Sequence, residues 1–114
     1  MTHPRFLLFE QHVTVACETS ESGSALGTVF GAFASSEERT PGPPVLSYTF
    51  GLGTTGEFLI RRGDEDLPLA QDTGMLLFRF EQDLVVELQK RRSDLYFLHA
   101  AVLERDGRAV LLLA

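Results

Sequence analysis

The chain has 114 residues, 44% of them hydrophobic and 23% charged, which is enough for one domain with a core of its own. The formal net charge of −6 argues against non-specific nucleic-acid binding, because such binding requires a basic surface. The single cysteine, Cys17, excludes a disulfide framework within the chain, and no apolar run approaches the roughly 18 residues of a membrane span. Without a signal peptide at its start, the sequence predicts a cytoplasmic protein.

The first part of the chain predicts two strands and a helix. Residues 6–9 form a short apolar run, and residues 12–17 are rich in β-branched side chains. The polar stretch that follows ends in Ser-Gly-Ser, which favours a helix N-terminus. Apolar residues at i, i+3, i+4 and i+7 then predict a helix of about ten residues with one buried stripe, formed by Leu26, Val29, Phe30 and Phe33. Two glycines on a neighbouring face, Gly27 and Gly31, favour close packing against a sheet.

A β-hairpin and a second helix are expected next. Residues 35–44 contain three prolines and form a loop, after which residues 45–50 and 57–62 read as strands around a glycine-rich turn. Residues 63–66 form an acidic turn. A helix capped by Asp72 or Thr73 follows, with an apolar stripe every four residues at Leu76, Phe80, Leu84 and Leu88. Polar side chains occupy its other side, at Arg79, Gln82, Asp83, Glu87 and Lys90.

The last expected element is a hairpin that begins near Tyr96, so that the order is β-β-α-β-β-α-β-β. This order predicts an α+β fold, with an antiparallel or mixed sheet and two helices packed on one face. We expect an N-terminal domain over residues 1–92 and a separate β-hairpin over residues 93–114. The strand of residues 109–113 is almost wholly apolar, which is typical of a strand covered on both faces.

Three local patterns resemble functional motifs, but the surrounding sequence favours a structural role for each of them. Residues 51–56 match GxGxxG, but a strand rather than a helix follows, which indicates a hairpin turn and not a dinucleotide site. The adjacent acids of residues 64–66 lack the spacing of a calcium loop and are expected in a solvated loop. Cys17 is expected as a buried small apolar residue, because no spacing supports a thiol–imidazole pair with any of the three histidines, His3, His12 and His99.

The C-terminal segment carries a resemblance to a known family. Leu98-His99-Ala100-Ala101-Val102, the turn at Gly107 and the apolar strand of residues 109–113 resemble the segment upstream of the P-loop in HPr kinase/phosphorylase-like proteins, as does the preceding helix that ends in arginines. The resemblance implies a protein serine kinase that uses ATP and Mg²⁺ in its full-length form. His99 maps near the active site of that family, and Ala100 stands where better-known members have glycine.

The chain itself contains no GxxxxGK[ST], so we assign it no catalytic, cofactor-binding or metal-binding residues, and His99 is only a weak catalytic candidate by its position. We expect the non-catalytic N-terminal part of an HPr-kinase-like protein, ending just before the P-loop, with a scaffolding or substrate-recognition role. Its partners would then be its own kinase core and a protein substrate. The alternative is a stand-alone interaction module that self-associates through its C-terminal strand as a dimer or larger oligomer. A small enzyme that uses His99 with Glu104 is a third interpretation.

Overall fold

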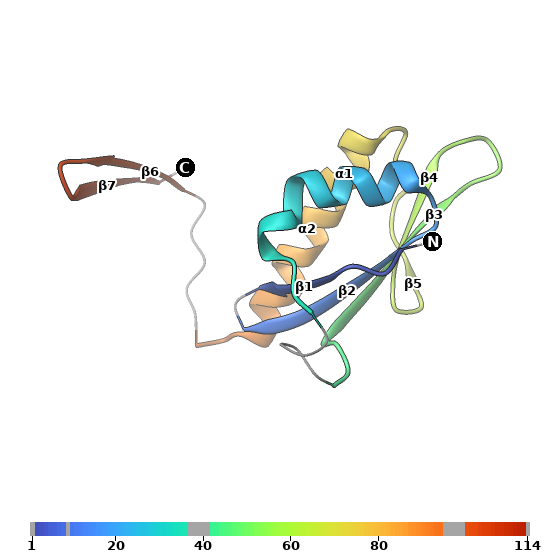
Figure 1. The fold of residues 1–114 in the computed structure, drawn as a ribbon, viewed down its shortest axis with the longest axis horizontal. Coiled ribbons are helices and arrows are strands. Elements are labelled where there is room, and N and C mark those ends of the chain that lie inside the picture. Colours follow the sequence, from blue (N-terminus) through green and yellow to red (C-terminus); the bar gives the residue numbers. More distant parts are fainter. Residues whose placement is uncertain (1, 9, 37–41, 95–99, 114) are drawn as a thin grey trace.

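The computed structural model describes residues 2–8, 10–36, 42–94 and 100–113. Within them the chain forms an α+β fold, as predicted (Figure 1). The elements in chain order are β1 (Arg5–Leu8), β2 (Gln11–Cys17), α1 (Ser20–Phe30), the 3₁₀ turn η1 (Gly31–Phe33), β3 (Leu46–Leu52), β4 (Phe58–Arg62), β5 (Glu65–Asp66), α2 (Thr73–Arg91), β6 (Ala100–Arg105) and β7 (Arg108–Leu113).

Five strands form a mixed sheet in the order β1-β2-β3-β4-β5. Strands β2 and β3 are parallel, and every other neighbouring pair is antiparallel. A parallel pair requires a crossover connection, which α1 provides here. Among the described strands, β6 and β7 pair only with each other and form a second, two-stranded sheet that stands apart from the first (Figure 1).

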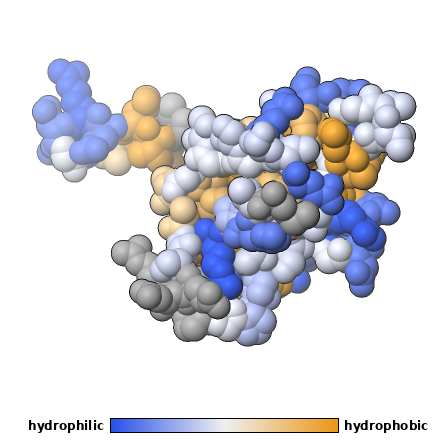
Figure 2. All heavy atoms as spheres, turned by 45° about the vertical axis from the view of Figure 1, so that its right-hand side comes forward, coloured by the Kyte–Doolittle hydropathy of each residue, from blue (hydrophilic) through white to orange (hydrophobic). Residues whose placement is uncertain are grey.

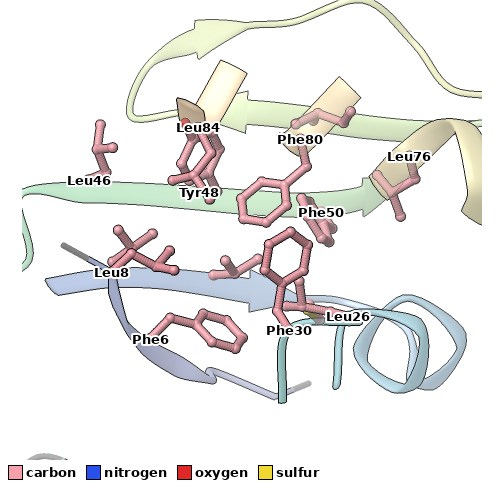
Figure 3. Packing of buried hydrophobic residues seen from close by; sticks show 14 of the residues in the cluster. Phe6, Leu8, Leu26, Phe30, Leu46, Tyr48, Phe50, Leu76, Phe80 and Leu84 are labelled. Atoms are coloured by element: carbon pink, nitrogen blue, oxygen red, sulfur yellow. The ribbon is translucent and has the colours of Figure 1, made fainter. Parts of the chain in front are cut away.

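Both helices lie on one face of the five-stranded sheet, where alternate strand residues are buried (Figure 1). Phe80 of α2 lies at the centre of this core (Figure 3). Its ring centroid is 4.9 Å from that of Tyr48, 5.2 Å from that of Phe50 and 5.3 Å from that of Phe30. All three pairs meet edge to face, the arrangement that the ring quadrupoles favour. These rings join the two helices to the central strand β3.

Helix α2 follows its predicted pattern, with one exception. Asp72 is the N-cap, and its Oδ1 accepts a hydrogen bond from the backbone N–H of Met75 at 2.8 Å. The predicted stripe is buried against the sheet at Leu76, Phe80, Leu84 and Leu88. Glu87, expected on the polar side, is buried as well. It can be buried as an anion because three cationic side chains pair with it.

The prediction for α1 is wrong in its start and in half of its stripe. The helix begins at Ser20, earlier than expected, because Thr19 caps it: the Thr19 Oγ1 accepts from the Ser22 N–H at 3.1 Å. Only Leu26 and Phe30 of the stripe are buried, while the other two members, Val29 and Phe33, are exposed. The α-helix ends at Phe30, and the change to a 3₁₀ turn alters the direction of the Phe33 side chain, whereas Val29 lies within the helix on its exposed side.

Two smaller expectations are also corrected. The helical glycines Gly27 and Gly31 make no close approach, since a Cβ at either position would have nothing within 4 Å. The acidic turn of residues 63–66 contains a short strand, β5, which pairs with β4. Among the described residues, neither helix combines the length and the apolar character that crossing a membrane would require.

Candidate functional site

The β6–β7 hairpin holds most of the residues that carry the family resemblance. Its two-residue turn consists of Asp106 and Gly107, both with positive φ, at 53° and 77°. Asp-Gly is a favoured pair for such a turn, because both positions must adopt the left-handed conformation. The register places Arg105 opposite Arg108 next to the turn and Ala100 opposite Leu113 at the open end. The predicted hairpin is therefore present over residues 100–113, and its expected start near Tyr96 lies outside the described residues.

Both faces of this hairpin are apolar in its middle. Directly paired residues of an antiparallel ladder lie on the same face, so Val102 and Leu111 share one face and Leu103 and Val110 share the other. All four side chains are exposed, by 63%, 49%, 61% and 59% respectively. The hydrophilic residues gather at the tip, and Figure 2 shows this division along the projecting hairpin. A two-stranded hairpin is marginally stable by itself, so these faces form a surface suited to being covered.

His99, the weak catalytic candidate, falls among residues 95–99, which the structure does not describe. Its expected place near an active site therefore stays a prediction. Ala100 is the first residue of β6.

A network of ion pairs lies between α2 and the sheet. The Tyr48 hydroxyl donates a hydrogen bond to Asp83 Oδ2 at 2.6 Å, and Arg62 donates to Asp83 Oδ1. Arg62 Nη1 is also 3.2 Å from Glu87 Oε1, and Arg91 Nη1 donates to Glu87 Oε2 at 3.0 Å. Burial raises the pKa of Tyr48, and the hydrogen bond to Asp83 raises it further. Burial alone would raise the pKa of Glu87, but Arg91 and Arg62 outweigh it and hold that pKa below its ordinary value. Because each acid has a cationic partner, this network holds α2 on the sheet.

His12 is a buried titratable side chain of β2. It is 8% exposed, and its Nδ1 has no hydrogen-bond partner within the part of the chain that the structure describes. Its Nε2 lies 3.3 Å from Nη1 of Arg5 on the neighbouring strand. Burial lowers the pKa of His12, and the positive charge of Arg5 lowers it further. The folded protein therefore favours the neutral imidazole at this position.

The other sequence motifs have structural positions. The GxGxxG match lies at the β3–β4 connection, where Gly53 N–H donates to the Glu57 carbonyl at 2.7 Å in an antiparallel hairpin. Of the three adjacent acids, Asp66 forms an ion pair with Arg61 at 2.8 Å and Glu65 forms one with Arg62. Cys17 is fully buried, and burial raises the pKa of its thiol, so it has the character of a small core residue.

Over the described ranges, no three His, Cys, Asp or Glu side chains gather as a metal site would require. No protein-family model, curated protein or solved structure matches the chain.

Proposed function

We propose that the chain is a non-catalytic part of an HPr-kinase-like, ATP-dependent protein serine kinase, with a scaffolding or substrate-recognition role in the cytoplasm. The supporting observation is the β6–β7 hairpin, whose residues resemble that family and whose two faces are both apolar. A strand pair of this kind suits a sheet that is covered on both sides. A kinase core with a P-loop after β7 would extend this sheet and place helices over both faces.

The five-stranded domain suits a scaffold. Its apolar core is already filled by two helices and four strands, and no GxxxxGK[ST] is present to hold a phosphate. In this proposal the five-stranded domain positions the core or contacts its protein substrate. The phosphoryl transfer belongs to the core, where the P-loop and Mg²⁺ would bind ATP.

The first test concerns the coding sequence and the nucleotide. We expect the gene to encode GxxxxGK[ST] in frame shortly after codon 114, and we expect the 114-residue chain to give no calorimetric signal with millimolar Mg-ATP. A stop codon directly after codon 114 would contradict the kinase proposal. Micromolar binding of Mg-ATP would contradict the assignment of the chain as non-catalytic.

The alternative is a stand-alone interaction module that self-associates through its C-terminal strand. The observation that favours it is that neither edge of the β6–β7 sheet pairs with another described strand, which leaves backbone donors and acceptors available on both edges. Light scattering at tens of micromolar protein should then show a dimer or larger species, and Leu111→Lys should return it to a monomer. Leu52→Lys is the matched control, since Leu52 is 50% exposed and Leu111 is 49% exposed. A wild-type chain that is strictly monomeric would contradict this alternative.

A further inference from the structure

His12 lies on the face of the five-stranded sheet opposite the two helices. Its neighbour Val13 is fully buried on the helix side, and successive side chains of a strand alternate between faces. The register places Leu7 of β1 directly opposite His12 on the outer face. His12 is nevertheless buried, so a titratable side chain is enclosed where the edge strand β1 meets β2.

The contact with Arg5 defines the charge state of His12. A guanidinium has hydrogen-bond donors and no acceptor, so the Nε2 that lies 3.3 Å from Arg5 Nη1 must be the acceptor. The ring proton of the neutral imidazole is then on Nδ1, which is buried and has no acceptor among the described residues. The observed geometry therefore requires a neutral His12 with its proton on Nδ1.

Strand β1 is the part of the sheet next to His12 that is easiest to displace. It has four residues and lies at the edge of the sheet, with β2 on one side. On its other side the described residues form a single bridge, between Phe6 and Ala34. Opening an edge strand breaks one ladder, whereas separating β2 from β3 would divide the central sheet.

We propose that His12 is a pH-sensitive latch of β1, and that protonation of its imidazole releases β1 from β2. Protonation turns Nε2 from an acceptor into a donor, so two cationic donors would face each other at the Arg5 contact. The imidazolium also needs an acceptor or water at Nδ1, for which the described residues provide no partner. A rotation of the Arg5 side chain would remove the repulsion but would leave Nδ1 buried. Opening β1 relieves both and uncovers the backbone edge of β2.

The other described groups around His12 do not compensate the added charge. Glu10, two residues earlier, is 90% exposed, and its carboxylate lies 3.8 Å from the guanidinium of Arg92. On the β3 side, Val45 donates its backbone N–H to the His12 carbonyl, and its side chain is uncharged. Burial lowers the pKa of His12 and Arg5 lowers it further, so the open state binds the proton more strongly. Because the open state has the ordinary pKa of about 6.5, the opening constant should rise about tenfold between about pH 7.5 and 5.5.

Amide hydrogen exchange in the full 114-residue chain tests the latch. The hydrogen bond from Val15 N–H to the Pro4 carbonyl sets the alternation of the β1–β2 ladder, so the amides of Phe6 and Leu8 point towards β2. After correction for the intrinsic exchange rate, their opening constant should rise about tenfold between about pH 7.5 and 5.5. At the lower pH it should exceed that of the Thr49 amide by at least about a hundredfold, because β3 stays paired with β4.

Two histidine substitutions separate the latch from a general effect of acid. His12→Gln keeps a neutral acceptor next to Arg5 and should hold the pH change of the opening constant below about twofold. His3→Gln, at an exposed position, is the matched control and should keep the rise of about tenfold. In the wild-type chain at about pH 7.5, nitrogen chemical shifts measured by nuclear magnetic resonance should place the ring proton of His12 on Nδ1.

The proposal is overturned if Phe6 and Leu8 exchange only together with Thr49 at both pH values, which would assign His12 to global stability alone. A rise that persists in His12→Gln would also contradict it. So would a ring proton on Nε2 of His12 in the wild-type chain, because Arg5 could then not donate to that nitrogen.

Discussion

Phe80 is the residue on which the packing of the five-stranded domain depends most. Its ring contacts aromatic rings from α1 and β3, and it is 1% exposed. Phe80→Ala should therefore lower the free energy of unfolding by about 3–5 kcal/mol, the usual cost of removing a buried aromatic ring. Urea denaturation measures this change. Phe78→Ala, on the same helix but exposed, should change it by less than about 0.5 kcal/mol, and equal effects of the two substitutions would contradict the described core.

His12 should make the stability of the protein depend on pH. Its pKa is lowered in the folded state by burial and by Arg5, so the unfolded chain binds the proton more strongly. The free energy of unfolding should be independent of this group well above the ordinary pKa of about 6.5, and it should fall as the pH drops below that value. Urea denaturation between about pH 7.5 and 5 measures the slope. His12→Gln should remove this contribution, and an unchanged slope in that variant would contradict it.

At the scale of single elements, the stability of α2 depends on its N-cap. Asp72→Ala removes the side-chain acceptor for the Met75 N–H and should lower the free energy of unfolding by about 0.5–2 kcal/mol. Glu81→Ala is the matched control, because it removes the same charge from an exposed position of the same helix. Thermal or urea unfolding compares the two variants. If both lose the same stability, the effect is one of charge and not of capping.

How far the elements could be predicted from the sequence differs between the two helices. In α2 the four-residue spacing, from Leu76 onwards, is long enough to define both the helix and its buried side. In α1 the stripe was short, and the sequence could not indicate that the α-helix would end at Phe30. The burial of Glu87 also depends on tertiary structure, because its partner Arg62 comes from a strand far away in the sequence.

The candidate surfaces were predicted in part. The apolar run of β7 indicated a strand suited to cover on both faces, and the observed register assigns its side chains to the two faces. The exposure of Met75, Phe78 and Val85 on α2 was not predicted. The four-residue spacing from Leu76 to Leu88 identifies only the buried side of the helix, and it leaves open which other apolar side chains remain uncovered.

The molecule as a whole consists of one filled core and one small sheet without a cover among the described residues. The two parts should therefore differ in local stability, which amide hydrogen exchange measures. Amides of β2 and β3 lie within the core and should exchange only through global unfolding, whereas a two-stranded hairpin opens locally at little cost.

In the monomeric chain we expect the amides of Leu103 and Val110 to exchange at least about a thousandfold faster than those of Val15 and Tyr48, corresponding to a difference of about 4 kcal/mol in opening free energy. Exchange followed by nuclear magnetic resonance at low protein concentration measures both groups together. Raising the concentration should slow exchange in the hairpin only if the hairpin itself is an interface between copies. Hairpin amides as protected as those of β3, at concentrations where the chain is monomeric, would mean that the β6–β7 sheet is covered within one chain.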